Sequence, residues 1–204
     1  ELEPFLPLPD IARDGSGDYT LSWNKPDSIG MVHSCLGNMN VLIKALIYIL
    51  SLGGEGLRNA SISASLNANY LKSKLTKSFA LPFATPTLHE FVLSDKIQKA
   101  AHITTMDMAK ALMEFGFHPP TVYFPLVVSG AIMIEPTETE PFEELDRFVQ
   151  AMETIAQQGM ENPQSLHDTP QGCPVTRVDE VWAARNLVLT WSMNESKGED
   201  LVSK

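Results

Sequence analysis

The sequence contains few of the residues that define several large classes of protein. Only two of its 204 residues are cysteines, Cys35 and Cys173, and neither lies in a CxxC pattern, which excludes a disulfide framework and a zinc ribbon. The 15 Lys and Arg residues are outnumbered by 25 Asp and Glu residues, and the net charge is −10. A general binder of nucleic acid or of an anionic membrane needs an excess of positive charge, so this composition excludes both classes.

Short catalytic motifs are absent as well. The sequence has no HExxH zinc motif and no GxSxG nucleophile motif, and its five histidines are too far apart to form a metal-binding pair on one helix turn. The glycine-rich stretch at 53–56 does not follow a predicted strand, as a phosphate-binding loop would. We therefore expect no metal site, no serine nucleophile and no nucleotide loop.

No uninterrupted apolar segment is long enough to cross a bilayer. The most apolar run, 41–52, has 12 residues and contains Lys44, whereas a membrane-spanning helix needs about 20. We predict that this run is a buried helix and that the protein binds no membrane. No basic-then-apolar signal peptide opens the chain, and the scarcity of cysteine is typical of a reducing intracellular compartment.

What the sequence does have is the composition and patterning of a globular α+β protein. Hydrophobic residues make up 44% and charged residues 20%, which provides enough apolar side chains for a core. The patterns predict four segments: an extended arm with a short strand over 1–27, two long helices over 28–78, an α+β small domain over 79–160, and a C-terminal tail with one short helix over 161–204.

The predicted elements follow from local signals. Ser28 is a candidate cap for a helix that ends at Gly53-Gly54, and Thr104 and Asp107 form a capping box for a helix that ends at Gly116. The other predictions are a strand over 19–23, a helix over 55–77, a strand over 88–93, a hairpin of strands over 122–128 and 131–134, a helix capped by Thr139 and ended by Gly159, and a short helix over 179–185.

Two polar stretches flank the predicted hairpin. His118 precedes Pro119-Pro120, whose φ angles are fixed, so its imidazole is either a positioned donor or base, or a side chain that caps the preceding helix. Glu135 ends an apolar strand, where a carboxylate needs a partner such as an arginine. The candidate partners are Arg147, Arg177 and Arg185. The carboxylates at 138 and 140 suit the N-terminus of the following helix and need no catalytic explanation.

Two asparagines and one cysteine interrupt the predicted helices. Asn67 and Asn69 lie in the middle of the second helix, where asparagine is unfavourable because its side chain competes for backbone hydrogen bonds. They indicate either contacts with another element or solvated positions. Cys35 is interpreted as a small core residue of the first helix.

Several uncommon sequence words occur in one order along the chain. They are KPDSIGMVHSCLGN (25–38), SLGGEGL (51–57), LNANYL (66–71), HEFVL (89–93), GFHPPTVYFPLVV (116–128), IMIEPTETE (132–140) and CPVTRVDEVWAARN (173–186). In these words the chain resembles the C-terminal portion of glycine decarboxylase, the P-protein of the glycine cleavage system. The last word resembles the closing segment of subunit 2 in the two-subunit bacterial form.

The resemblance implies a fold and a set of site residues. Enzymes of this family use pyridoxal phosphate (PLP) on a type I, aspartate aminotransferase-like fold. The portion in question is its C-terminal small domain, an α+β structure with a small sheet, helices packed on one face, and two long helices. Seven residues match motif positions: His89, Glu90, His118, Thr121, Glu135, Thr137 and Glu138. Together with Asn67 and Asn69, they are the candidates for the wall of the active-site cleft or for its support.

The resemblance also indicates what this chain does not carry. The family's cofactor lysine follows a histidine in a large upstream domain, and none of the ten lysines here follows a histidine. Met31 and Cys35 stand where the family pattern has a basic residue and an aromatic one. PLP is therefore implied for the whole enzyme, no covalent PLP is expected on this chain, and no catalytic residue is assigned.

Two functions follow as expectations. In the first, the chain is part of a glycine decarboxylase that decarboxylates glycine and passes the aminomethyl group to the lipoylated H-protein. It is then inactive without the PLP domain, and its partner in an oligomeric enzyme is the missing half or a second subunit. In the second, it is a non-catalytic binding module for a partner subunit or a lipoyl carrier protein. A bacterial origin implies the cytoplasm, and a eukaryotic one the mitochondrial matrix.

Overall fold

The structure is a computed structural model that describes residues 1–33, 37–191 and 193. Cys35, predicted to be a core residue, lies outside the described residues. The chain divides into two compact units, Glu1–Arg58 and Asn59–Lys204, which are described one at a time. The division falls inside the segment in which the sequence predicts two long helices.

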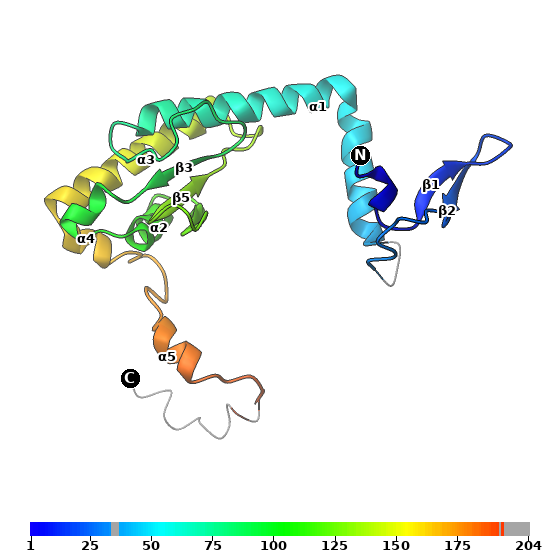
Figure 1. Ribbon diagram of the computed structural model, residues 1–204. Helices are drawn as coiled ribbons and strands as arrows, with labels where there is room; N and C mark the ends of the chain where they lie inside the picture. The colour runs from blue at the N-terminus through cyan, green and yellow to red at the C-terminus, as the bar shows by residue number, and fades with distance from the viewer. Residues whose placement is uncertain (34–36, 192, 194–204) are drawn as a thin grey trace. The chain divides into compact units, whose positions relative to one another are not determined.

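The first unit contains a short hairpin and the beginning of a long helix (Figure 1). Its elements before the helix are η1 (Glu3–Phe5), β1 (Asp10–Arg13) and β2 (Tyr19–Ser22). β2 confirms the strand predicted over 19–23, whereas β1 lies where the sequence predicts an extended arm. The chain reverses between the two strands because the Asp14 carboxylate accepts hydrogen bonds from the backbone N–H groups of Ser16 and Asp18, both at 3.0 Å.

Helix α1 (Met39–Leu75) continues from the first unit into the second and is interrupted at Gly53. Gly53 has φ 64° and ψ −179°, a conformation that only glycine adopts without strain, and the helix is kinked there. The kink confirms the two helices predicted on either side of Gly53-Gly54.

The first half of α1 differs from the prediction in its start and in its burial. It begins at Met39 because Asn38 is the cap, with Oδ1 accepting from the N–H of Val41 at 3.3 Å. Ser28, the predicted cap, instead donates its hydroxyl to the carbonyl of Leu6 at 2.6 Å. The prediction that 41–52 is buried is wrong within the first unit, where all of these residues are exposed.

The second unit is a small α+β layer, which confirms the predicted fold class (Figure 1). Three short antiparallel strands pair in the order β3-β5-β4: β3 (Phe91–Ser94), β4 (Thr121–Val122) and β5 (Ala131–Ile134). The helices of this unit that accompany the sheet are the second half of α1, η2 (Gln98–Ala101), α2 (Thr105–Glu114) and α3 (Phe142–Glu161).

One hydrophobic core joins these helices to the sheet. The buried hydrophobic residues run from Ala68 to Leu166, so the whole core belongs to the second unit. The stripe predicted for the second half of α1 is confirmed at its buried positions Ala68, Leu71 and Leu75. The largest fully buried apolar side chains are Phe79, Leu71, Leu75, Leu93, Ile103, Met108, Leu112, Ile132, Met152, Ile155 and Leu166.

Helix α2 begins and ends as the sequence predicts. The Thr104 hydroxyl accepts from the N–H of Asp107 at 3.3 Å, and the Asp107 carboxylate accepts from the N–H of Thr104 at 2.9 Å, which completes the capping box. Gly116 follows the helix with φ 77° and ends it. The positions before and inside the cap, Ile103 and Met108, are fully buried.

Two predicted strands are shorter than expected. β3 begins at Phe91 rather than at residue 88. The strand predicted over 122–128 is reduced to Thr121–Val122 because Tyr123 takes φ 56° and Pro125 has no N–H to donate. The N–H of Tyr123 still bonds the carbonyl of Ala131 at 2.8 Å, so the hairpin is joined by a loop rather than by the predicted tight turn at Ser129-Gly130.

Helix α3 is displaced at both ends from its predicted bounds. Its N-cap is Pro141, and the hydroxyl of Thr139, the predicted cap, lies 2.9 Å from that of Thr137. The helix continues past Gly159 to Glu161. A Cβ at Gly159 would lie 3.1 Å from Leu166 and 3.3 Å from Ile103, so this glycine permits close packing and does not end the helix.

The described part of the C-terminal segment contains two short helices. The sequence does not predict α4 (Pro163–His167). It does predict α5 (Glu180–Arg185), which is capped by Asp179 through a 2.8 Å bond from the N–H of Trp182.

Candidate functional site

A cleft of about 490 Å³ opens on the second unit between the segment after α2, the end of β5 and the start of α3. Three of the predicted site residues line it: His118, Thr121 and Glu135. They come together because β4 and β5 pair antiparallel, with Thr121 opposite Met133, so that the segment before β4 and the segment after β5 lie side by side. Three residues predicted from separate sequence motifs therefore lie in one cleft, which is the candidate site.

The backbone of the cleft is stiff on the His118 side. Gly116 turns the chain out of α2, and Pro119 and Pro120 then fix two successive φ angles before β4 begins. The imidazole of His118 is exposed, and among the described residues no hydrogen bond joins it to α2. The interpretation of His118 as a helix cap is thus not supported, and its ring is available at the cleft.

An aromatic pair forms the apolar wall of the cleft. The rings of Phe117 and Phe148 meet edge to face with centroids 5.2 Å apart. The guanidinium of Arg147 lies 4.6 Å from the centre of the Phe117 ring and pairs with Glu144 at 2.6 Å. The cleft therefore combines a rigid apolar side with a rim of carboxylates.

The loop after β5 is held by one asparagine. Nδ2 of Asn67 donates to the carbonyls of Thr137 at 3.0 Å and of Glu140 at 3.4 Å. Asn67 thus contacts another element, which is one of the two interpretations given above. These hydrogen bonds to the 137–140 loop offset the low helix propensity of asparagine inside α1. Thr137 and Glu138 belong to this loop and do not line the cleft.

Asn69 supports a different loop. Its amide nitrogen donates to the carbonyl of Thr87 at 2.7 Å, and its oxygen accepts from the N–H of Thr87 at 3.2 Å. The Thr87 hydroxyl in turn donates to the carbonyl of Glu90. His89 and Glu90 lie on this loop, 3.9 Å apart and both solvent-accessible, and neither lines the cleft.

The predicted arginine partner of Glu135 is not found in the described part of the chain. Arg147 pairs with Glu144, and Arg177 pairs with Asp107 at 2.8 Å. No ion pair joins Glu135 to any arginine among residues 1–33, 37–191 and 193. Glu135 is exposed at the cleft, so water solvates its carboxylate and the argument that required a partner does not apply.

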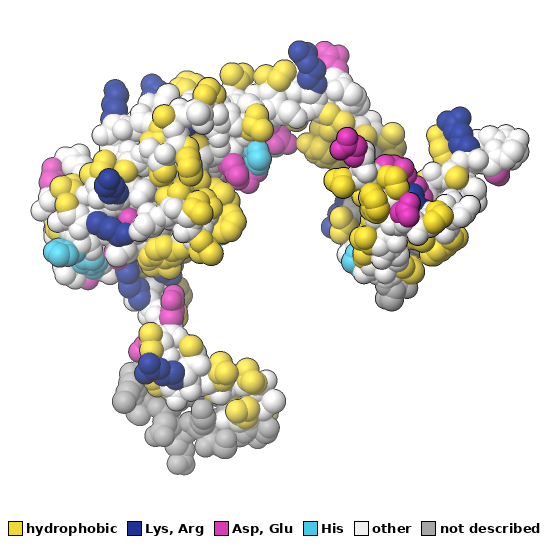
Figure 2. Space-filling view, in the orientation of Figure 1, with side chains coloured by type: hydrophobic (Ala, Val, Ile, Leu, Met, Phe, Trp, Pro, Cys, Tyr) yellow, Lys and Arg dark blue, Asp and Glu magenta, His cyan; other side chains and the backbone are white. Residues whose placement is uncertain are grey.

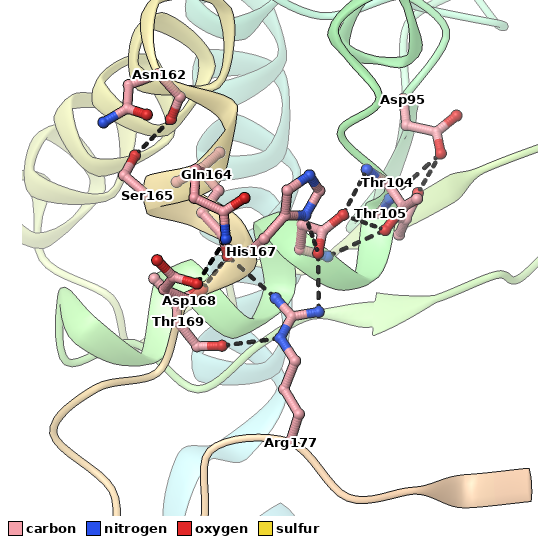
Figure 3. Close-up of polar contacts among 12 residues, drawn as sticks. Asp95, Thr104, Thr105, Asn162, Gln164, Ser165, His167, Asp168, Thr169 and Arg177 are labelled. Atoms are coloured by element: carbon pink, nitrogen blue, oxygen red, sulfur yellow. Dashed lines mark hydrogen bonds and ion pairs between the residues drawn. The ribbon is translucent and has the colours of Figure 1, made fainter.

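Arg177 closes a separate cluster, the C-terminal clamp, formed by Asp107, His167 and Arg177 (Figure 3). The Asp107 side chain is 5% exposed, and its Oδ1 lies 2.8 Å from Arg177 Nη1 and 3.3 Å from His167 Nδ1. The same guanidinium donates from Nη2 to the carbonyl of Leu166 at 3.0 Å and from Nε to that of Thr169 at 3.1 Å. One arginine therefore ties the tail to the end of α4 and to the start of α2.

Asp107 is held in its ionised form. Burial of the carboxyl raises its pKa, but hydrogen bonds from Thr104, His167 and Arg177 outweigh burial, so that the pKa of Asp107 lies below its usual value. The carboxylate thus serves as helix cap and as anion of the clamp at once.

Four residues of the cleft are missed by the sequence reasoning. Phe117 and Phe148 provide the wall, and Glu140 and Glu144 provide the rim. Phe148 belongs to the predicted apolar stripe of α3. Glu140 lies just before the helix and Glu144 in its first turn, where the helix dipole accounts for negative charge. No local signal distinguishes a cleft position from an ordinary helix position here.

Comparison with known proteins decides the family. The family profile described as "Glycine dehydrogenase, C-terminal domain" matches residues 60–170, which include every residue that lines the cleft. The chain belongs to this family. The resemblance seen in the sequence words is thereby confirmed.

Relatives in several bacteria extend the match to most of the chain. "Probable glycine dehydrogenase (decarboxylating) subunit 2" of Caldanaerobacter subterraneus subsp. tengcongensis is 50% identical over 192 residues, which is 94% of this chain and 39% of the relative. The protein of the same name from Listeria monocytogenes serotype 4a is 47% identical over 191 residues, 94% of this chain and 39% of the relative. The chain thus spans about 39% of the length of these relatives.

A solved structure supports the fold. The crystal structure of glycine decarboxylase (P-protein) of the glycine cleavage system, in inhibitor-bound form, matches with a TM-score of 0.55 over 72% of this chain and 35% of that chain. The sequences are 19% identical, so this match speaks for the fold alone. It agrees with the predicted C-terminal domain of a PLP-enzyme fold.

The cleft does not fit PLP. Its ionisable lining residues are His118, Glu135, Glu140 and Glu144, and it has no lysine for an imine and no cation for a phosphate. Lys72 is the buried lysine of the described chain, and its amine donates to the carbonyl of Thr85 in a loop outside the cleft. The residues that line this cleft therefore supply neither an imine lysine nor a phosphate cradle.

Proposed function

We propose that this chain is the C-terminal part of a PLP-dependent glycine dehydrogenase (decarboxylating) and acts only together with the cofactor-bearing remainder of the enzyme. The observation that carries the proposal is the family match over 60–170. The matched region includes the cleft and the two loops that Asn67 and Asn69 bind. In the whole enzyme, glycine would be decarboxylated and the aminomethyl group passed to the lipoylated H-protein. The subunit 2 relatives favour a companion subunit and an oligomeric enzyme in the cytoplasm of a bacterium.

The chemistry of the cleft suggests that this chain and the cofactor-bearing remainder have different roles. PLP, when bound in the remainder of the enzyme, supplies the electron sink for decarboxylation. The carboxylate rim formed by Glu135, Glu140 and Glu144 repels anions and accepts hydrogen bonds, so it suits the wall of a site rather than a phosphate pocket. His118, held on a proline-stiffened segment, can donate or accept one hydrogen bond at a fixed position.

The test compares the chain alone with the chain in an assembled enzyme. The 204 residues would replace the matching 39% of the Caldanaerobacter subunit 2, and this chimera would be co-expressed with the companion subunit of that organism. We expect release of CO₂ from glycine, in the presence of lipoylated H-protein and PLP, from the chimera and not from the chain alone.

A covalent assay checks the absence of a cofactor lysine independently. Borohydride reduction of the chain alone with PLP, followed by mass spectrometry, should show no stoichiometric pyridoxyl-lysine. A single modified lysine in the isolated chain, or CO₂ release without the remainder, would overturn the proposal.

A second candidate function is a non-catalytic binding module. The observation that favours it is the exposed first unit, which offers an apolar surface to a partner subunit or a lipoyl carrier. Native mass spectrometry of the chain with lipoylated H-protein distinguishes the two. A complex formed without the remainder supports the module, and a lone chain supports the enzyme part.

A further inference from the structure

The first half of α1 is an apolar helix that the described residues of the first unit leave uncovered. Ten of the twelve residues in 41–52 are hydrophobic, and their exposure ranges from 38% at Leu52 to 72% at Leu50. Figure 2 shows hydrophobic side chains at the surface of the first unit. Monomeric proteins rarely expose an apolar surface of this extent, so the helix is expected to be covered by something else.

The apolar side chains surround the helix rather than forming one stripe. Lys44 and Ser51 are seven positions apart and therefore share one narrow face, and the ten hydrophobic residues occupy the rest of the circumference. The Ser51 hydroxyl donates to the carbonyl of Ile47 at 2.7 Å, which satisfies it inside its own helix. A flat partner would cover only one side, whereas this helix needs an environment that encloses it.

The rest of the first unit does not provide that environment. None of its described residues, 1–33 and 37–58, is buried. A two-stranded hairpin such as β1–β2 is marginal without a layer to pack on, and a unit without buried side chains has no core of its own. The first unit is therefore incomplete by itself.

A lipid bilayer is the first environment to consider. Among the described residues α1 is the one helix long and apolar enough to cross a membrane. Its straight part ends at Gly53, however, and the residues from Met39 to Leu52 span about 21 Å at roughly 1.5 Å per residue, against about 30 Å for the hydrocarbon core. The apolar helix is too short for a bilayer and fits the interior of a protein.

We infer that the helix over 39–52 is enclosed by the portion of a glycine dehydrogenase subunit 2 that lies outside the matched 39%. The inference rests on the proposed function. That portion is longer than the present chain, since the 192 matched residues correspond to 39% of the Caldanaerobacter relative, so it is large enough to surround a helix. A second copy of the chain is the alternative occupant, and the concentration dependence measured below distinguishes it.

Hydrogen exchange measured by mass spectrometry tests the inference on the chain alone and on the chimera described above. In the chain alone the amides of 39–52 should exchange quickly, because an uncovered helix of this length is marginal in water. In the chimera they should exchange at least about 100-fold more slowly. Amides of α2 and α3, whose core is complete in both proteins, serve as the internal reference and should exchange at similar rates.

Three results would overturn the inference. They are equal exchange of 39–52 in both proteins, protection in the chain alone that rises with its concentration, and protection by phosphatidylcholine vesicles that the chimera does not reproduce. The first excludes enclosure, the second identifies a second copy, and the third identifies lipid. Activity is measured separately. An inactive chimera with a protected helix contradicts the proposed function but not the enclosure of the helix. An active chimera with an unprotected helix supports the proposed function and contradicts the enclosure.

Two substitutions in the chimera test the same point. Ile47→Ala should accelerate exchange of 39–52 by about 10-fold or more. The Ile47 side chain is 60% exposed in the chain alone, and the substitution removes the contacts that this side chain would make with the enclosing portion. Ile47→Glu should prevent soluble assembly. The matched control is Met160→Glu on α3, which is 54% exposed and lies in the second unit. If Ile47→Ala leaves exchange unchanged, the helix is not enclosed.

Discussion

Two histidines that match different motifs of the same family have different surroundings. His118 lines the cleft on a segment stiffened by Pro119 and Pro120, whereas His89 lies on a loop outside it beside Glu90. Both residues match family motifs, but only His118 lies where it can contact a ligand in the cleft. His89 lies on a loop outside the cleft.

This difference predicts different kinetics in the assembled enzyme. His118→Ala should lower kcat/KM for glycine by about 10- to 100-fold, because a fixed hydrogen-bonding group at the cleft is removed. His89→Ala is the matched control and should change kcat/KM less than about 3-fold, with any effect appearing in thermal stability. Equal losses in the two variants would contradict the assignment of His118 to the cleft.

Asp107 is the most connected carboxylate of the described chain, since it caps α2 and binds Arg177 in the C-terminal clamp (Figure 3). Asp107→Asn should lower the free energy of unfolding by about 2–3 kcal/mol, because it leaves the guanidinium without its anion and weakens the cap. Urea denaturation followed by circular dichroism measures the change. Glu144→Gln, which removes a partly exposed pair with Arg147, should cost less than about 1 kcal/mol.

The same residue predicts a pH dependence. Because the pKa of Asp107 is lower in the folded protein than in the unfolded one, its contribution to stability is fully present above the unfolded value of about 4 and is lost as the pH falls through the folded value. The difference in unfolding free energy between wild type and Asp107→Asn should therefore shrink as the pH falls below about 4. A difference that grows below about pH 4 would contradict the lowered pKa.

At the scale of elements, the accuracy of the sequence predictions depends on how local their cause is. The capping box of α2 requires only Thr104 and Asp107, and it is found as predicted. The N-cap of α3 is misplaced because Thr139 bonds Thr137 instead, within a loop that Asn67 positions from a distant helix. A contact between residues about 70 positions apart cannot be predicted from a short stretch of sequence.

Gly53 and Gly54 offer a matched pair of substitutions in α1. Gly53→Ala should cost about 1–3 kcal/mol, because φ 64° with ψ −179° is strained for any residue with a Cβ. Gly54→Ala should be neutral or stabilising by up to about 1 kcal/mol, since no atom lies within 4 Å of its added Cβ. Thermal unfolding of the assembled enzyme measures both. If the two substitutions have the same effect, the kink is not required.

At the scale of the whole molecule, the two units differ in whether they can stand alone. All buried hydrophobic residues lie between Ala68 and Leu166. A fragment of residues 59–191 should therefore unfold cooperatively with a Tm within about 3 °C of the complete chain, because deleting 1–58 removes no buried side chain. Differential scanning calorimetry checks this, and loss of a cooperative transition would show that the first unit contributes to the core.

The candidate site could be predicted only in part for a related reason. His118, Thr121 and Glu135 were found through motifs, and pairing of β4 with β5 brings them to one cleft. The motifs also predict His89 and Glu90 as site residues, although these two lie on another loop. A match to a motif does not say how far a residue lies from the cleft. The composition of 41–52 predicts a buried helix, and the first unit leaves that helix exposed.

The position of Arg177 has a practical consequence for producing this domain. The family profile ends at residue 170, and the guanidinium that neutralises Asp107 is supplied from beyond that boundary. A clone truncated at the end of the profile would encode the entire apolar core and yet leave the buried Asp107 carboxylate without the guanidinium that pairs with it. The smallest soluble version of this domain should therefore be sought with a C-terminal end after residue 177, not at the end of the region by which the family is recognised.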